Sequence, residues 1–461
     1  MKPRLTQWLI GLCLLVLMTG LGYGVEQSDF YPLIGLYAVF FGLYVWVCRQ
    51  KLTISQVHFF IACGIVLRFM LLFSMPNLSD DIYRFIWDGR LINQGINPFE
   101  QLPSYYIHAY QGVPLQGITS DLFAQLNSPE YFTIYPPIAQ GVFALATWLF
   151  PTSISGSAFV MKLFLFGCEV GSIFLLYKLF RQQLQTILWY VLNPLIILEI
   201  VGNLHFEGAM IFFLLGAIFP FYLLNVMSLQ RRKGAELDAF VSKKQDLWGY
   251  TKKGFVFSAI LFAASIASKL LTLLFLPFLI RMMGWKRSFQ YYSIVGLVLL
   301  LLFFPLLSGV FFSNFGESLD LYFRRFEFNG SLYYITRWLG FQMNGYNMIA
   351  KIGPALALFA TSGILILAFG KKRQLLHFPP LSLWAICLYL LCTTTVHPWY
   401  TALPVVLCLF TPFRFPILWS GLIFLTYINY SYTEYFANMW VVALEYSLVL
   451  GFLLYEILRE K

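Results

Sequence analysis

The sequence predicts an all-α polytopic membrane protein with about 12 to 14 crossings of the bilayer. Composition is the first reason: of the 461 residues, 59% are hydrophobic and only 11% are charged, whereas soluble domains contain about 25% charged residues. The second reason is that apolar runs of roughly 17 to 25 residues recur along the chain, which is the length that a helix needs to cross about 30 Å of hydrocarbon. We therefore expect a single integral-membrane domain over residues 1–461.

The N-terminal part of the chain is expected to form three spans, near residues 7–24, 31–48 and 55–75. The first of them follows a short basic N-terminus, as in a signal peptide. It lacks a small-residue cleavage site, however, and further spans follow at once. With Lys2 and Arg4 in the cytoplasm, the positive-inside rule places the segment 76–134 outside. This longest weakly hydrophobic stretch is the predicted first outer loop.

The net charge of +10 comes from basic residues in short loops between apolar runs, so it indicates topology rather than a surface for nucleic acid. The most basic loop, 228–253, is expected in the cytoplasm. An odd number of the apolar runs between 136 and 227 must then cross. We expect the short run 136–150 not to span, and the alternative is the run 186–202, which Asn193-Pro194 interrupts. Either choice places GNLHFEG (202–208) on the outer side.

The second half of the chain places further polar residues at the same face. Lys269 divides the apolar residues 254–283 into two short pieces, which predicts a re-entrant pair or a tight hairpin with Lys269 near its apex. A second outer loop is expected at 308–345, and HPWY (397–400) is also expected outside. Ionisable residues at membrane depth are candidates for functional sites, so this outer face is where we expect the activity.

The charged stretch NLSDDIYRFIWDGRLINQGINPF (77–99) predicts a short helix. Ser79 can cap a helix that begins at Asp80, and Gly95 and Pro98 end it. Its apolar and charged residues lie on different sides, which is typical of an amphipathic helix on a membrane surface. Two interpretations stay open: the acids are caps and the arginines contact lipid headgroups, or an acid in this helix performs chemistry.

Several motifs occur in a characteristic order along the chain. SDDIYRFIWDGRLINQGINPF in the first outer loop is followed by YPP at 135–137, LNP and then NLHFEG, SIASKLLTLLFLPFL around Lys269, and HPWY. Together they resemble the bacterial polyprenyl-phosphate-mannose-dependent mannosyltransferases of the GT-C architecture, such as the enzymes that build α-1,6-linked mannan in mycobacteria. They are distantly similar to the eukaryotic enzyme that adds the first mannose to glycosylphosphatidylinositol anchors. The resemblance extends from about residue 77 to 404.

The resemblance implies that an aspartate of the first outer loop is the catalytic base. The family pattern D-[IV]-Y falls on Asp81-Ile82-Tyr83, so Asp81 is the first candidate and Asp80 the second. The family more often has HxD after the LNP helix, whereas this chain has His205 and the longer acid Glu207. The resemblance also implies inversion at the anomeric carbon, which gives an α-linked product from a β-linked donor.

The chemistry of such a donor requires few groups from the protein. Polyprenyl phosphate is a good leaving group, so one carboxylate that takes the proton of the acceptor hydroxyl is enough. The departing phosphate gains negative charge and needs fixed cations or hydrogen-bond donors nearby. The candidates for binding the substrate or its phosphate are Arg84, Tyr135, His205, Glu207, Lys269, Arg324, Arg325 and His397.

The predicted partners are a polyprenyl-phosphate sugar, a glycan or glycolipid acceptor and membrane lipids, without nucleic acid. The sequence predicts no dedicated metal site, and it neither requires nor excludes a divalent cation. Mannose comes from the resemblance, and the location that we expect is the plasma (inner) membrane of a bacterium, with the active site on the outer, periplasmic side. The alternatives are a transporter or flippase of lipid-linked sugars and a polysaccharide polymerase or ligase. A transporter usually carries paired broken helices, which this sequence does not show.

Overall fold

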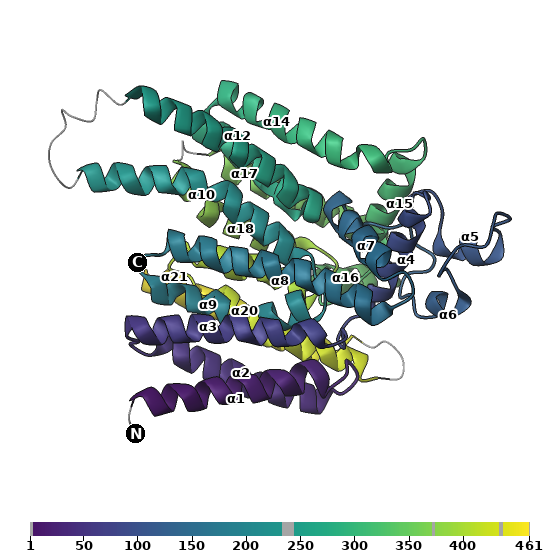
Figure 1. The fold of residues 1–461 in the computed structure, drawn as a ribbon, viewed down its shortest axis with the longest axis horizontal. Helices are drawn as coiled ribbons and strands as arrows, with labels where there is room; N and C mark the ends of the chain where they lie inside the picture. Colours follow the sequence, from purple (N-terminus) through teal and green to yellow (C-terminus); the bar gives the residue numbers. More distant parts are fainter. Residues whose placement is uncertain (1–2, 233–243, 371–373, 433–436, 461) are drawn as a thin grey trace.

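The computed structural model describes residues 3–232, 244–370, 374–432 and 437–460, and these residues form a bundle of helices. One isolated parallel bridge, between Phe328 and Thr395, is the exception among them. The long helices run side by side, and both chain termini lie at the same end of the bundle (Figure 1). The short helices α4 (Asp81–Asn93), α5 (Pro103–His108) and α6 (Ser120–Phe123) lie at the other end.

Eight helical segments of the described residues are long and apolar enough to cross a membrane. They are α1 (Pro3–Tyr23), α2 (Phe30–Arg49), α3 (Ile54–Met70) with η1 (Leu71–Phe73), α8 (Ile154–Leu179), α14 (Trp285–Phe303) with η5 (Phe304–Leu306), α17 (Ile349–Phe369), η6 (Leu375–His377) with α18 (Phe378–Cys392), and α21 (Met439–Arg459). The chain is therefore an all-α, multi-pass membrane protein, as the composition predicted.

Further helices, some of them broken or short, pack among these spans. The segment that Asn193-Pro194 interrupts is bent by 56° between Leu184–Val191 and Ile196–Gly202, and it would be a ninth span if both parts cross together. The others are α7 (Pro137–Leu149), α10 (Glu207–Arg232), α12 (Lys244–Ser268), η4 (Leu270–Phe275) with α13 (Leu276–Met283), η7 (Pro398–Thr401) with α19 (Ala402–Cys408), and α20 (Phe415–Leu422) with η8 (Ile423–Tyr430). The expected 12 to 14 crossings stay a prediction, because that number depends on which of these segments cross.

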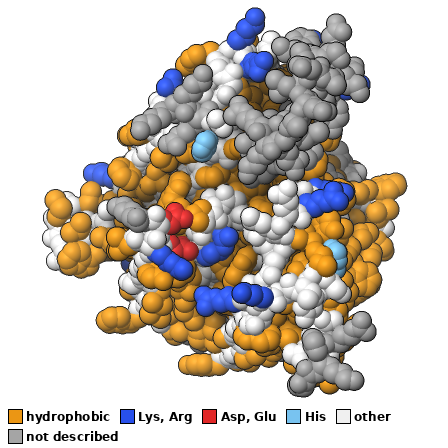
Figure 2. Space-filling view, turned by 90° about the vertical axis from the view of Figure 1, so that its left-hand side faces the viewer, with side chains coloured by type: hydrophobic (Ala, Val, Ile, Leu, Met, Phe, Trp, Pro, Cys, Tyr) orange, Lys and Arg blue, Asp and Glu red, His pale blue; other side chains and the backbone are white. Residues whose placement is uncertain are grey.

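Basic side chains gather at the end of the bundle that carries the termini, as Figure 2 shows. Four helices have a basic residue in their last turn at this end: Arg49 in α2, Lys178 in α8, Arg281 in α13 and Arg459 in α21. This is the distribution that the positive-inside rule expects of a cytoplasmic end. Residues 233–243 of the predicted basic loop lie outside the described residues.

Helix α4 begins at Asp81, with Asp80 as its N-cap residue, and Gly95 (φ +74°) lies just after its end. Of the two interpretations of this stretch, the one in which its arginines contact lipid headgroups was wrong, because both side chains are buried among protein groups. Arg84 is 3% exposed, and Arg90 donates to the carbonyl of Gly117. Two neighbours cover them: the loop 117–131, whose carbonyls accept from both arginines, and α7, which packs so closely that a Cβ at Gly89 would lie 2.4 Å from the carbonyl oxygen of Phe143.

The helix is interrupted at Lys269, between α12 and η4, as expected. However, α12 is a helix of 25 residues rather than a short piece. Its first turns come from the basic loop, which the apolar pattern did not include. The chain then returns through η4 and α13 toward the end that carries the termini, where Arg281 donates to the carbonyl of Gly370. Lys269 itself therefore lies at the end of the bundle where α4 is found.

Buried charges fix the segment that leads into α4. Lys162 of α8 is fully buried, and its Nζ donates to the carbonyls of Leu71 and Ser74 and to the Ser74 hydroxyl, at 2.7 to 3.0 Å. Two helical turns further along α8, Glu169 accepts from Arg68 Nε at 2.8 Å. These bonds join α3 to α8 and hold the chain where it leaves α3, a few residues before Asp80 and Asp81.

Candidate active site

A polar cavity of about 530 Å³ lies at the end of the bundle opposite the termini. Segments far apart in the sequence line it: Leu78–Asp81 with the start of α4, residues 127–135, Lys269, α15 (Phe311–Arg324), residues 326–328 and residues 395–400. Helix α16 (Ser331–Asn344) also lies at this end of the molecule. The first and second predicted outer loops and HPWY thus meet around one cavity.

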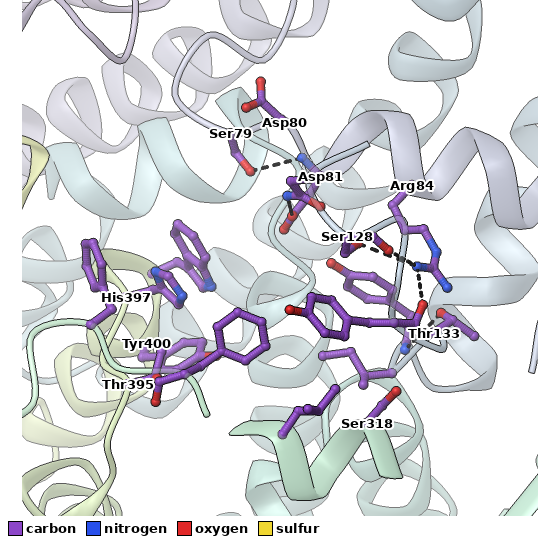
Figure 3. A pocket seen from close by; sticks show the side chains of 18 of the residues that line it. Ser79, Asp80, Asp81, Arg84, Ser128, Thr133, Ser318, Thr395, His397 and Tyr400 are labelled. Carbon is purple, nitrogen blue, oxygen red and sulfur yellow. Dashed lines mark hydrogen bonds between the residues drawn. The ribbon is translucent and has the colours of Figure 1, made fainter. Parts of the chain in front are cut away.

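The two adjacent aspartates differ in their direction. In Figure 3 the Asp81 carboxylate points toward the middle of the cavity, whereas the Asp80 carboxylate points away from it. Asn127 donates to Asp81 Oδ1 at 2.8 Å, and the hydroxyl of Ser79 accepts from the Asp81 N–H. Partial burial and the neighbouring negative charge of Asp81 raise the pKa of Asp80. The helix start thus presents one carboxylate to the cavity and holds it through an amide.

Arg84 holds the wall of the cavity together. Its Nε donates to Asp88 at 2.9 Å. Its Nη1 donates to the carbonyls of Ser128 and Tyr131 at 3.0 and 2.8 Å (Figure 3). Gln140 of α7 in turn donates to Asp88 and to Thr133. Arg84 lines the cavity, but its Nη1 already fixes the loop that carries Asn127, and its Nε is bonded to Asp88 within α4.

Lys269 brings a cation to the cavity from the break between α12 and η4. Its Nζ lies 3.1 Å from Glu207 Oε1 and 5.8 Å from the centre of the Tyr135 ring. Glu207 is completely buried at the start of α10, whereas the Lys269 side chain is 20% exposed. Glu207 therefore anchors Lys269 from behind, and the ammonium group stays accessible from the cavity.

A series of stacked rings forms another side of the cavity. Ring centroids are 3.7 Å apart for His205 and Trp399, 4.5 Å for Trp399 and His397, and 4.7 Å for His397 and Phe328. Burial and the positive charge of Lys269 lower the pKa of His397 to about 3, and burial likewise lowers the pKa of His205. Both imidazoles are therefore neutral at physiological pH. The buried Nδ1 of His397 has no hydrogen-bond partner among the described residues.

An apolar groove of about 300 Å³ adjoins the polar cavity. It is lined mainly by leucines of η4 together with Leu319 of α15 and Tyr389 of α18. Lys269 and Tyr400 line both spaces. A molecule with a charged group and a long hydrocarbon chain therefore fits this arrangement, with its charge beside Lys269 and its chain in the groove.

The structure brings together most of the residues that the sequence singled out. Asp80, Asp81, Arg84, Tyr135, Lys269 and His397 line the cavity. His205 and Glu207 are buried behind it and contact Trp399 and Lys269. Arg324 and Arg325 do not line the cavity, and Arg324 instead pairs with Asp320 at 2.7 Å on an exposed part of α15. The expected role of these two arginines in gripping phosphate therefore has no support from the geometry.

Sequence reasoning missed several residues that line the cavity. Asn127, which holds Asp81, lies in a stretch of the first outer loop that has no recognisable motif. Glu327 also lines the cavity, and its carboxylate accepts from Arg337 at 2.7 Å and from Tyr333 at 2.6 Å. Asn127 has no sequence signal, and Glu327 was expected at the outer face only as one of the charged residues of the second outer loop. The partners of both residues lie close only in the folded chain. Among the described residues, no group of three or more His, Cys, Asp or Glu side chains is placed to hold a metal ion.

Comparison with protein families identifies a family that matches the chain. The model of the MptA_B family, described as alpha-(1->6)-mannopyranosyltransferase, N-terminal domain, matches residues 7–285. This is more than half of the 461 residues and includes α4, Glu207 and Lys269. No curated protein and no solved structure matches the chain.

Proposed function

Because the chain belongs to the MptA_B family of alpha-(1->6)-mannopyranosyltransferases, we propose that it transfers mannose from a polyprenyl-phosphate donor to a glycan or glycolipid acceptor. Family membership makes the protein a mannosyltransferase, and the proposal adds the donor, the face of the membrane and the residues that act. The reaction takes place in the polar cavity, at the outer face of the plasma membrane. The basic end of the bundle, opposite this cavity, supports that orientation.

We choose this donor because the polar cavity and the apolar groove adjoin each other. A sugar carried on a nucleotide needs no hydrocarbon groove, whereas a polyprenyl-phosphate sugar has a polar head and a long apolar chain. Lys269 lines both spaces, so its ammonium group can contact the phosphate when the chain lies along the leucines of η4. A fixed cation at this point stabilises the charge that develops on the departing phosphate.

The proposed step needs one base. The acceptor hydroxyl attacks the anomeric carbon of mannose as Asp81 takes its proton, and the bond from that carbon to the phosphate oxygen breaks. The electron pair leaves with polyprenyl phosphate, whose charge Lys269 offsets. Phosphate leaves without prior protonation, so a second carboxylate acting as acid is unnecessary. Attack from the face opposite the phosphate inverts the anomeric configuration.

Asp81 is preferred to Asp80 as the base for two reasons. Its carboxylate points into the cavity and accepts a hydrogen bond from Asn127, which orients one oxygen and leaves the other for the acceptor hydroxyl. Asp80 points away and lies at the N-cap position. General-base catalysis contributes about 10²- to 10⁴-fold to a rate, so the two residues should differ clearly on substitution.

Transfer by the purified protein in proteoliposomes tests the choice of donor. The wild type should move radiolabelled mannose from polyprenyl-phosphate mannose to a lipid or glycan extract, and should not use a nucleotide-linked mannose. Transfer from the nucleotide donor alone would contradict the proposal, although the protein would remain a mannosyltransferase. Movement of the lipid-linked sugar across the bilayer without any transfer would instead show that the polar cavity is a transport site.

A further inference from the structure

Glu199 belongs to none of the motifs discussed above, yet it is completely buried beside the cavity. It lies in η3 (Ile196–Gly202), a single stretch of π-helix, and π-helical turns occur frequently at functional sites. The turn that follows contains Leu204 at φ +65°, a left-handed conformation that non-glycine residues adopt only where other contacts enforce it. The backbone N–H of His205 closes this turn by donating to the Glu199 carbonyl at 3.2 Å.

The Glu199 carboxylate contacts three side chains. Oε1 accepts from the Tyr427 hydroxyl at 2.7 Å. Oε2 accepts from Asn203 Nδ2 at 3.4 Å and lies 3.3 Å from Nε2 of His205. The hydrogen bonds from Tyr427 and Asn203 offset the lost hydration of this buried carboxylate, whereas Nε2 of His205 lies close to it without a hydrogen bond. The contacts with Asn203 and His205 lead to residues that line the cavity.

The contact between Glu199 and Asn203 leads to the start of α4. Because Asn203 turns its NH₂ group toward Glu199, its Oδ1 faces the other way and accepts from the backbone N–H of Leu78 at 3.2 Å. Leu78 is buried, and it precedes Asp80 and Asp81 by two and three residues. The orientation of one amide thus transmits the position of the Glu199 carboxylate to the segment that carries the proposed base.

The contact between Glu199 and His205 leads to the stacked rings. His205 places Nε2 at Glu199 and its ring face against Trp399, which stacks in turn on His397. The same carboxylate is therefore connected to two sides of the cavity, the side that carries Asp81 and the side that carries His397.

We propose that Glu199 is a positioning residue of the transferase, which orients Asn203 and His205 and thereby sets Asp81 against the stacked rings. Glu199 itself touches no substrate, and the inference rests on the proposed function of the cavity. This role requires one orientation of the Asn203 amide. Its Oδ1 must accept from the Leu78 N–H, and its NH₂ group must donate to Glu199.

This directionality allows a test by exchange of hydrogen-bond polarity. Asn203→Asp retains an oxygen for the Leu78 N–H but sets a second carboxylate against Glu199. Adding Glu199→Gln supplies an amide NH₂ that can donate to the carboxylate introduced at position 203, so the double variant restores both bonds and the original net charge. Ser288→Ala, which removes a buried hydroxyl bonded to the Leu279 carbonyl near the end of the bundle that carries the termini, is the control for a general loss of stability.

We expect Asn203→Asp to lower kcat at least 30-fold with less than a threefold change in the KM for the donor, and the double variant to recover to within about fivefold of wild type. Glu199→Gln alone should lower kcat about three- to tenfold. Ser288→Ala should leave kcat within threefold at a similar loss of thermal stability. A double variant no more active than Asn203→Asp, or losses of kcat that follow thermal stability in all variants including Ser288→Ala, would overturn the inference.

Hydrogen–deuterium exchange of the peptide 77–81 gives a second measurement, which does not depend on transfer. Asn203→Asp should accelerate exchange in this peptide at least tenfold, and the double variant should restore it. If wild type transfers no mannose, the proposed function fails while exchange still decides the positioning. Unchanged exchange in Asn203→Asp would overturn the positioning role even in an active enzyme.

Discussion

Lys269 and Glu207 form an ion pair of 3.1 Å at the point where the polar cavity meets the apolar groove. One partner is completely buried and the other is 20% exposed, so the pair holds a cation at the cavity surface rather than hiding it in the protein. In the absence of a bound anion, Glu207 is the group that neutralises the Lys269 charge. This ion pair places a cation where the apolar groove ends, which is the position that the proposed function assigns to the phosphate of the donor.

Lys269→Met should therefore lower kcat/KM for polyprenyl-phosphate mannose at least 100-fold, because the developing charge on the phosphate loses its cation and Glu207 is left unpaired. Lys269→Met combined with Glu207→Gln removes both charges and should fold better than the single variant, but it should remain as inactive. Steady-state kinetics and thermal unfolding of the three proteins check this. A double variant that regains wild-type activity would show that Lys269 only neutralises Glu207.

The groove should discriminate donors by chain length. Leu274→Trp in η4 fills part of the groove, so it should raise the KM for a long-chain polyprenyl-phosphate mannose at least tenfold and change that for a short-chain analogue less than threefold. Leu297→Trp on the exposed face of α14 is the matched control and should affect neither donor. Equal effects of Leu274→Trp on both donors would mean that the chain binds elsewhere.

Close contact between α4 and α7 should make Gly89 irreplaceable. A Cβ at Gly89 would lie 2.4 Å from the carbonyl oxygen of Phe143, whereas a Cβ at Gly141 would meet nothing within 4 Å. Gly89→Ala should therefore lower the free energy of unfolding by about 1–3 kcal/mol and reduce transfer, because α4 carries Asp81. Gly141→Ala should preserve both. Comparable melting temperatures for the two variants would contradict this packing.

The low pKa of His397 should make the stability of the protein depend on pH. Its pKa is about 3 in the folded protein, against the ordinary value of 6.5 for an imidazole, so between these values the unfolded chain binds a proton that the folded protein does not. Stability should then be complete above about pH 6.5 and fall as the pH decreases, by at most about 1.4 kcal/mol per pH unit from this residue.

His397→Phe should flatten that dependence between pH 5 and 7, measured by thermal unfolding in detergent. Some slope should remain, because the pKa of His205 is lowered in the same direction. A slope as steep as that of wild type would mean that His397 is protonated in the folded state as readily as in the unfolded chain.

The sequence predicted the class of fold and the end of the bundle where polar residues gather, since both follow from hydropathy and charge. It also located the break at Lys269 and the helix end at Gly95. It did not predict the environment of α4, because amphipathic periodicity identifies two faces without indicating what covers them. Burial of Arg84 and Arg90 depends on α7 and on the loop at 117–131, which are tertiary partners.

Residues of the candidate site could be predicted where they stand in short sequence motifs, but not where their role depends on tertiary contacts. Asp81, Lys269 and His397 were found because they stand in short motifs of the family. Arg324 and Arg325 were proposed from charge and loop position alone, and neither lines the cavity; Arg324 pairs instead with Asp320. Glu199 and Asn127 carry no motif, and their roles follow from hydrogen bonds to residues 4 and 46 positions away in the chain.

Removal of the acceptor proton by Asp81 is the step on which the proposed mechanism depends, and comparison of Asp81→Asn with Asp80→Asn tests it. Both variants remove one carboxylate at neighbouring positions, and equal protein in proteoliposomes with matched melting temperatures allows their kcat values to be compared. We predict a loss of at least 100-fold for Asp81→Asn and of less than tenfold for Asp80→Asn. Full activity in Asp81→Asn, or a greater loss in Asp80→Asn, would contradict the assignment of Asp81 as the base.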